Sequence, residues 1–213
     1  MKGRKARGGG RSKIPGARTT ARPLLPLPSR KGEGQGEGSL SGEQTVLTIS
    51  NRQRARPINV RLLRRICTAL LNQLLEIKNS ELGIALVGTV EMTRVNETFL
   101  RHTGSTDVIT FDYLDLGPQT SDFRPRSVHG ELFICVDEAV TQARRFRTTW
   151  QSEIIRYIIH GVLHLLGHDD HRAADRRKMK REENRLLHLL GKPTRFNGLH
   201  QATTKSAIEK RRS

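Results

Sequence analysis

Two histidines stand four positions apart, His160 and His164, in an apolar stretch that predicts a helix. On a helix this spacing places both imidazoles on one face, one turn apart. Neutral imidazole nitrogens suit a divalent metal, and zinc in particular. Gly167 favours a helix end, so the chain can turn back and bring a third ligand from Asp170 or His171. The sequence therefore predicts one zinc ion per chain.

The residue directly after His160 separates this motif from that of the zinc proteases. Those enzymes carry a glutamate at this position as general base, whereas this chain has Gly161. A metallohydrolase of peptides or small molecules is therefore disfavoured.

Positive charge dominates the chain and is concentrated at its ends. The 213 residues carry a formal net charge of +17 at pH 7, with 38 Lys and Arg against 21 Asp and Glu. Residues 1–39 contribute +8 and residues 201–213 contribute +3, so residues 40–200 are only mildly basic. Such a balance predicts a polyanionic partner, most often nucleic acid.

The cysteines and the apolar runs indicate the compartment. Cys67 and Cys135 each lie in an apolar run, which predicts buried free thiols rather than a disulfide and fits a reducing cytoplasm. No apolar run approaches the ~20 residues of a membrane span, and the basic N-terminus lacks the apolar core of a secretory signal. We therefore expect a cytoplasmic protein with no membrane partner.

Composition divides the chain into three parts. Residues 1–42 are rich in Gly, Pro, Ser and Arg and cannot bury a core, so we expect a disordered basic extension. This extension either adds affinity for RNA through phosphate contacts or is dispensable. Residues 43–192 form the expected domain, and residues 193–213 an expected basic, flexible tail.

Hydrophobic periodicity predicts the elements of the domain. Apolar runs predict four strands, at residues 45–50, 83–88, 107–111 and 130–136. Helical periodicity predicts helices at 57–76, 90–101 and 137–147, one that runs into the metal motif, and one at 172–190. Asp137 is expected to cap the third helix, and Thr148 or Thr149 the fourth. The result is an α+β (α/β-like) fold: a small mixed four-stranded sheet covered by helices, with the last two strands antiparallel.

Three segments together resemble the YbeY endoribonuclease family of bacterial rRNA maturation factors. The motif from His160 to Asp169 looks like the metal-binding motif of that family. Residues 106–111 are similar to its Thr-Asp-Val-Leu-Ser-Phe strand, and residues 130–135 to its Gly-Glu/Asp-Ile-x-Ile-Cys strand. Their order and spacing also match, so the resemblance covers about residues 45–190.

The resemblance implies a single-strand-specific, metal-dependent endoribonuclease. Its bound metal would be Zn²⁺, and it would act in 16S rRNA 3′-end maturation and ribosome quality control. Its partners would be RNA (the 16S rRNA precursor) and the ribosome or small-subunit proteins, with no DNA expected.

The chain departs from the family pattern at the third metal ligand. The family pattern His-x₃-His-x₅-His places its third histidine at the position of Asp170. Family members also carry a Met fifteen residues after the second metal histidine, and Met179 stands fifteen after His164, so the register has no gap. Asp170 is therefore the first choice as third ligand, and His171 is the alternative.

Five further residues have open roles. The family's phosphate-binding Arg aligns with Leu100, so we expect Arg101 or His102 to substitute for it. Asp169 either holds a ligand imidazole in its tautomer or only forms the turn after the helix. Asp107 and Glu131 lie on the two family-like strands. Asp107 either orients the site or only starts its strand, and Glu131 either faces the site or pairs with an Arg.

A second function also fits the motif. In a non-enzymatic ribosome-binding factor, the metal would only staple the C-terminal helices. Structural zinc sites are usually closed by four protein ligands, and the motif offers four. They are His160, His164, Asp170 and His171.

Overall fold

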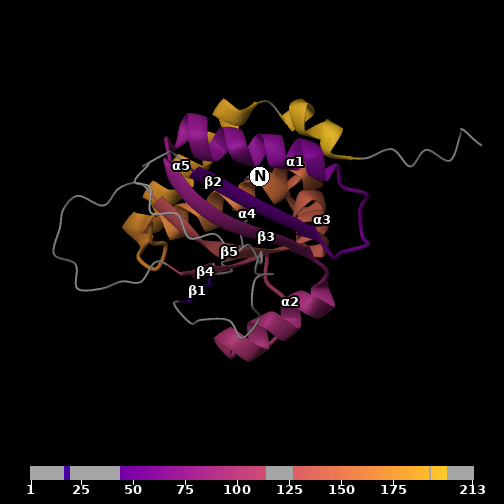
Figure 1. The fold of residues 1–213 in the computed structure, drawn as a ribbon. Helices are drawn as coiled ribbons and strands as arrows, with labels where there is room; N and C mark the ends of the chain where they lie inside the picture. Colours follow the sequence, from indigo (N-terminus) through magenta and orange to yellow (C-terminus); the bar gives the residue numbers. More distant parts are fainter. Residues whose placement is uncertain (1–16, 20–43, 114–126, 192, 201–213) are drawn as a thin grey trace, which may run out of the picture.

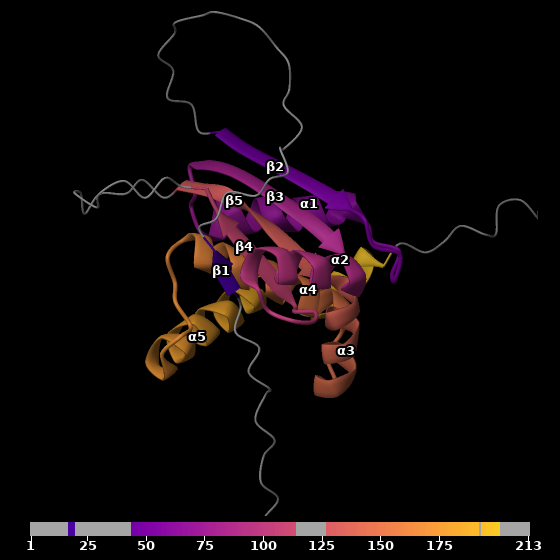
Figure 2. The same cartoon turned by 90° about the horizontal axis from the view of Figure 1, so that it is seen from below.

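A computed structural model shows one mixed β-sheet with helices on both faces (Figures 1 and 2). The structure describes residues 17–19, 44–113, 127–191 and 193–200. Five strands form the sheet in the order β1-β4-β5-β3-β2. They are β1 (Ala17–Thr19), β2 (Gln44–Asn51), β3 (Asn79–Val87), β4 (Val108–Asp112) and β5 (Ser127–Cys135).

Strand pairing agrees with the mixed sheet predicted from the sequence. The β2–β3, β3–β5 and β1–β4 pairs are parallel, whereas β4 and β5 pair antiparallel, with Thr110 opposite Leu132. The four predicted strands and the antiparallel pair are confirmed. The short edge strand β1 is an addition from within the extension expected to be disordered, whose other residues lie outside the described part of the chain.

The helices divide unequally between the two faces of the sheet (Figures 1 and 2). One face is covered by α1 (Val60–Thr68) with its π-helical continuation η1 (Ala69–Leu74), α4 (Trp150–Leu165), α5 (Ala173–Leu190) and η3 (Pro193–Leu199). The other face is covered by α2 (Thr89–Val95) and η2 (Asn96–Leu100). Helix α3 (Val136–Phe146) packs beside α4.

Strand β5 supplies apolar side chains to both cores. Leu132 and Ile134 belong to the larger core, and Phe133 and Cys135 belong to the smaller one. This is the alternation expected of a strand covered on both faces. Cys135 and Cys67 are buried free thiols, as predicted, and burial raises the pKa of Cys67 to about 12.

One predicted cap is wrong and another is resolved. Asp137 does not cap α3, whose N-cap is Cys135. Its carboxylate instead accepts hydrogen bonds from the Thr89 amide (2.8 Å) and hydroxyl (3.0 Å), at the first residue of α2. Thr149 caps α4, since its hydroxyl accepts from the Ser152 amide at 3.2 Å. The sequence could not reveal the Asp137 contact because its partner lies 48 residues away.

The ordered domain extends past the predicted boundary at residue 192. Phe196 and Leu199 of η3 are buried, and the Leu199 carbonyl accepts from the Asn59 amide at 2.8 Å. Residues 193–200 are therefore part of the domain rather than of a flexible tail, and residues 201–213 lie outside the described part. Among the described helices, none is long and apolar enough to cross a membrane.

Candidate metal centre

Helix α4 presents the two histidines from a nearly buried position. Most of its residues are buried, including His164, and the His160 side chain is 17% exposed. The Nε2 atoms of His160 and His164 are 3.0 Å apart. The spacing of four therefore does bring both imidazoles to one point, as the sequence predicted.

Each imidazole is held through its other nitrogen. His160 Nδ1 donates to Glu183 Oε1 at 2.6 Å, and His164 Nδ1 donates to the backbone carbonyl of His168 at 3.0 Å. A proton on each Nδ1 leaves the Nε2 lone pair of each ring available, which is the arrangement found in histidines that bind metals. The two rings are thus oriented toward the same point.

The turn after α4 brings in the third donor. Gly167 adopts a left-handed conformation (φ +89°), which lets the chain reverse directly after the helix. The ligand atoms of His160, His164 and Asp170 all lie within 4.8 Å of one another. This places Asp170, the first choice from the sequence register, in the same group as both histidines.

An orphaned oxygen tests whether this group fits a metal. Asp170 Oδ1 is buried and accepts no hydrogen bond from the described residues, which is costly for a carboxylate without a compensating partner. Two imidazoles and one carboxylate are a donor set that catalytic zinc sites use. The Nε2–Nε2 distance of 3.0 Å is also near the ~3.3 Å between two nitrogens of a tetrahedral zinc site. The residues present therefore fit zinc.

His171 and Asp169 lie at the exposed side of the turn. They form a second possible group with Asp170, but their side chains are 73% and 50% exposed. Asp169 Oδ1 accepts from the amides of His171 (3.0 Å) and Asp170 (2.7 Å). These bonds hold the pKa of Asp169 below its usual value, and the charges of His171 and His164 lower it further. These are the contacts of a turn residue, the second of the two interpretations of Asp169.

Sequence reasoning missed Glu183, the partner of His160. Burial by itself would raise its pKa, but the hydrogen bond and charge of His160 and the charge of Arg156 hold it below its usual value. In turn, Glu183 outweighs the effect of burial on His160 and raises the pKa of that imidazole. One signal was available, because Glu183 falls four residues after Met179 and so on the apolar face of α5.

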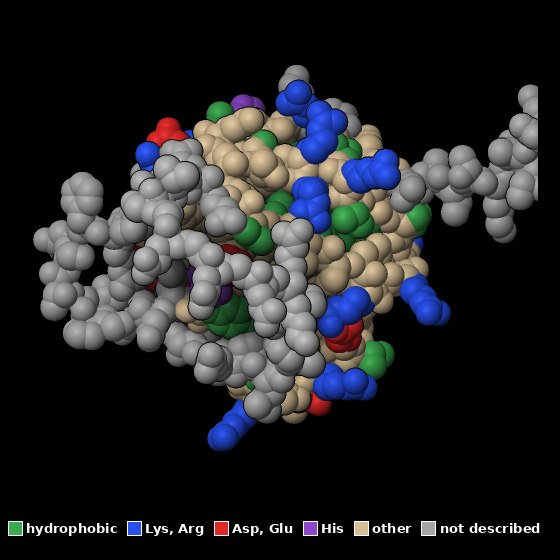
Figure 3. All heavy atoms as spheres, viewed as in Figure 1, with side chains coloured by type: hydrophobic (Ala, Val, Ile, Leu, Met, Phe, Trp, Pro, Cys, Tyr) green, Lys and Arg blue, Asp and Glu red, His purple; other side chains and the backbone are tan. Residues whose placement is uncertain are grey.

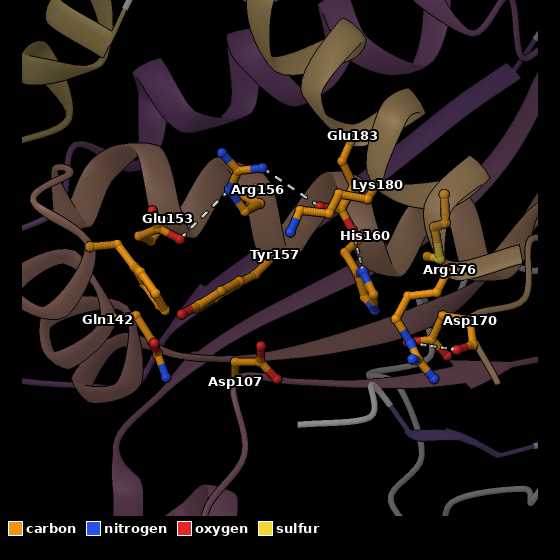
Figure 4. A pocket seen from close by; sticks show the side chains of 12 residues that line it. Asp107, Gln142, Glu153, Arg156, Tyr157, His160, Asp170, Arg176, Lys180 and Glu183 are labelled. Atoms are coloured by element: carbon orange, nitrogen blue, oxygen red, sulfur yellow. Dashed lines mark hydrogen bonds and ion pairs between the residues drawn. The ribbon is translucent and has the colours of Figure 1, made fainter. Parts of the chain in front are cut away.

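A cavity of about 160 Å³ opens beside the group (Figure 4). Its wall comes from α3, α4, α5, the turn between α4 and α5, and the residue before β4. It is lined by Asp107, Gln142, Phe146, Glu153, Arg156, Tyr157, His160, Asp170, Arg176, Met179, Lys180 and Glu183. Three cations in this wall, Arg156, Arg176 and Lys180, could meet an anionic substrate.

The structure separates the residues whose roles the sequence left open. Asp107 lines the cavity, whereas Arg101 and His102 are exposed and do not line it. Arg101 ends η2 in a left-handed conformation (φ +56°). Glu131 accepts from the Tyr113 hydroxyl at 3.1 Å, and the charge of Arg52 acts on it. Neither Arg101 nor Glu131 is therefore part of the cavity wall.

Gly161 also explains sterically why the protease motif is absent. A Cβ atom at this position would lie 2.6 Å from Leu132 Cδ2 and 3.2 Å from Thr110 Oγ1. Helix α4 thus approaches the sheet so closely that a larger side chain at this position would have to displace the buried Leu132 side chain.

The part of the chain that holds this geometry matches a known protein family. A model of the family described as endoribonuclease YbeY matches residues 48–191, which include the metal group and all of the cavity wall. The chain belongs to the YbeY family. Membership supports an endoribonuclease role, that is, a hydrolase that acts on RNA.

Curated YbeY relatives cover most of the domain. The endoribonuclease YbeY of Geobacter sulfurreducens is 31% identical over 151 residues, which cover 68% of this chain and 95% of that protein. The Chlorobium luteolum relative is 38% identical over 110 residues, 52% of this chain and 74% of its own. The Myxococcus xanthus relative is 39% identical over 127 residues, 60% of this chain but only 42% of that protein.

Similarity to a solved structure supports the fold and nothing beyond the fold. The solution structure of TM1509 from Thermotoga maritima superposes with a TM-score of 0.52 and 21% sequence identity. It covers 76% of this chain and 99% of that one. The α+β fold inferred from the sequence is therefore confirmed.

Proposed function

We propose that this YbeY family member is a single-strand-specific, zinc-dependent endoribonuclease. Its role would be 16S rRNA 3′-end maturation and ribosome quality control in the cytoplasm. The observation that carries the proposal is the group of His160, His164 and Asp170, which gathers three donors beside a cavity with a cationic wall. Three protein ligands leave one position open for water or substrate, as in catalytic rather than structural zinc sites.

Different side chains would bind the metal and orient its ligands next to the cleaved phosphate. When bound, a zinc ion would act as a Lewis acid and lower the pKa of a water molecule from ~15.7 to ~7. Glu183 and the His168 carbonyl keep protons on the two Nδ1 atoms, so that both Nε2 atoms remain ligands. Asp170 supplies the negative ligand.

Two cations remain to stabilise the negative charge that develops on the phosphate. Arg156 is engaged by Glu183 at 3.6 Å and by Glu153 at 3.7 Å. Arg176 donates to the carbonyls of Asp170 and His171, both at 3.0 Å, which fixes its guanidinium at the turn. Arg176 and the nearby Lys180 are therefore the better placed pair to contact the phosphate.

Surface charge supports RNA as the substrate. Figure 3 shows Lys and Arg side chains over the face that carries α1, where Arg61, Arg64 and Arg65 are exposed. Such a surface attracts a phosphate backbone in a salt-dependent way. The ribosome or small-subunit proteins are the partners that this role implies.

A cleavage assay on matched strands tests the proposal. The purified chain is incubated with a labelled RNA hairpin whose loop and stem are both long enough to be cut. We expect products from the loop only, and a lower rate for Lys180→Gln. Equal cutting of stem and loop would contradict single-strand specificity. Binding without any cutting would favour the ribosome-binding factor, and X-ray absorption should then show four protein ligands on the zinc.

A further inference from the structure

Cations form a continuous row on α5 that begins in the wall of the cavity. Arg176 and Lys180 line the cavity, where Figure 4 shows both side chains. Residues three or four apart are neighbours on the surface of a helix. Arg177 therefore lies beside Lys180, and Arg181 lies beside Arg177, further around the helix from the cavity. We call Arg177 and Arg181, which the proposed reaction does not use, the outer arginines.

The outer arginines have no partner within the described part of the chain. Both residues are exposed, and neither side chain forms a hydrogen bond or an ion pair with another described residue. They stand four positions apart, which places two like charges one turn from each other and destabilises the helix. An anion that contacts both side chains would remove this repulsion.

The acids of α5 lie away from this row of cations. Asp175 pairs with Lys178 at 3.4 Å, and Glu182 pairs with Arg185 at 2.6 Å. With 3.6 residues per turn, both pairs lie on the opposite flank of α5 from the row. The only other acid of the helix, Glu183, is buried. Interleaved charges would be enough for solubility, so this segregation indicates that one side of α5 meets a polyanion.

A single strand of RNA is the polyanion that fits the row best. The row starts at the two cations that we expect at the cleaved phosphate, and the nucleotides on either side of that phosphate carry further phosphates. The outer arginines are ~6 Å apart along the helix axis, at 1.5 Å per residue. They can therefore contact separate phosphates of one strand. An acidic protein surface would not explain why the row starts in the cavity.

We propose that the outer arginines bind phosphates of single-stranded RNA next to the cleaved one, so that α5 extends the RNA-binding surface beyond the cavity. This proposal rests on the proposed function, because it takes RNA as the substrate. Contacts to phosphates position a strand and carry no sequence information. The outer arginines should therefore act on long strands, which leave the cavity, and should act equally on strands of different bases.

Two double variants with the same change in charge test the proposal. Arg177→Gln with Arg181→Gln removes the outer arginines. Lys178→Gln with Arg185→Gln is the matched control, because it removes two cations from the opposite flank of the same helix. Glutamine has nearly the helix propensity of lysine and arginine, so α5 should persist in both variants. Thermal melting checks the fold of each.

Binding is measured by fluorescence anisotropy with labelled oligouridine strands of four and of twenty nucleotides. The full chain is titrated in zinc-loaded form and, in parallel, with chelator so that the strand stays intact. Each titration is repeated over a range of salt concentrations. The slope of log affinity against log salt concentration then reports the number of phosphate contacts.

Loss of the outer arginines should lower this slope by about 1.4 for the long strand, since each phosphate contact on a single strand contributes ~0.7. Between about 1 M and about 0.1 M salt, a slope difference of this size amounts to about 25-fold in affinity. The affinity for the four-nucleotide strand should change less than about threefold, because that strand ends near the cavity. A twenty-nucleotide cytidine strand should show the same loss as the uridine strand.

The matched control should change each affinity less than about threefold, because Lys178 and Arg185 already pair with acids. Equal losses in the two double variants would mean that only total charge matters, and would overturn the proposal. An unchanged affinity for the long strand without the outer arginines would overturn it as well, and would assign these cations to another polyanion. If the double variant fails to fold, Arg181→Gln alone should lower the slope by about 0.7, and an unchanged slope overturns the proposal.

The outcomes also separate this proposal from the proposed function. A chain that cuts RNA but loses the same affinity for short and long strands without the outer arginines contradicts binding beyond the cavity and leaves the endoribonuclease standing. A chain that shows the predicted losses for the long strand but cuts no strand supports RNA binding by α5 and contradicts the endoribonuclease.

Discussion

Two groups of side chains that could hold a metal ion share Asp170 and differ in what surrounds them. His160 and His164 lie on a buried helix, and each imidazole donates its Nδ1 proton to a fixed acceptor. Asp169 and His171 lie on the exposed side of the turn, where Asp169 is engaged by backbone amides. Both groups satisfy the same distance criterion.

The difference shows that ligand spacing alone does not make a site. A metal gains most from ligands that are already oriented, because ordering free side chains costs conformational entropy. In the buried group, Glu183 and the His168 carbonyl already orient the two imidazoles, so less entropy is lost when a metal binds. The exposed group would have to order His171 when the metal binds.

The difference between the two groups is tested first by removing a candidate ligand from each. Asp170→Ala should weaken zinc binding by more than about 100-fold, because a direct ligand should count for more than the outer partners of a site. His171→Ala should change it less than about threefold, since the exposed imidazole lies outside the buried group. Competition titration with a chromophoric chelator measures both. A larger loss in His171→Ala would make the exposed group the site.

A second test removes the hydrogen-bond partner of His160 and keeps the candidate ligands. Glu183→Gln keeps the size of the side chain but weakens the acceptor for His160 Nδ1, so zinc affinity should fall about 10- to 100-fold. The matched control is Glu182→Gln, one residue earlier, whose carboxylate pairs with Arg185 at the surface. Equal effects of the two substitutions would show that orientation of His160 does not matter.

Rates of RNA cleavage compare an arginine of the cavity wall with an exposed one. Arg176→Gln should lower the rate of RNA cleavage about tenfold, because it removes a charge from the cavity wall. Arg101→Gln, at the exposed end of η2, should lower it less than about threefold. The rates are compared at saturating RNA, so that weaker binding through lost surface charge does not enter. A larger loss of rate in Arg101→Gln than in Arg176→Gln would favour Arg101, the candidate from the sequence, as the phosphate-binding residue.

The smallest effect is expected at Asp169. Asp169→Asn keeps the oxygen that accepts from the two amides, so the turn should persist and zinc affinity should change less than about threefold. Isothermal titration with zinc measures this. A tenfold loss would mean that the charge of Asp169 acts on His164, as the other interpretation held.

The sequence predicted the parts of the molecule that repeat locally. Alternation in residues 45–50 and the helical period of α4 each lie within one element, so they specify strand and helix without knowledge of neighbours. The same holds for the pair His160 and His164. The candidate third ligand, Asp170, required a register to Met179, and the structure brings its carboxylate close to both imidazoles.

What the sequence could not give depends on contacts between distant segments. Glu183 lies 23 residues from His160, and only the packing of α5 on α4 brings them together. The short helix η3 has no clear periodicity, yet its Phe196 is buried because η3 packs against α1 and α4. The family pattern aligned its arginine with Leu100, and Arg101 was expected to substitute as a neighbour in sequence. Sequence proximity does not show that Arg101 ends η2 outside the cavity wall.

The most direct test of the proposed function is the dependence of cleavage on one zinc ion held by the buried group. The purified chain is stripped of metal, and cleavage of a single-stranded RNA is followed as zinc is added, beside His164→Ala. We expect no cleavage by the stripped chain, full recovery at one zinc per chain, and no recovery in the variant. Undiminished cleavage by the stripped wild type, or by His164→Ala, would contradict it.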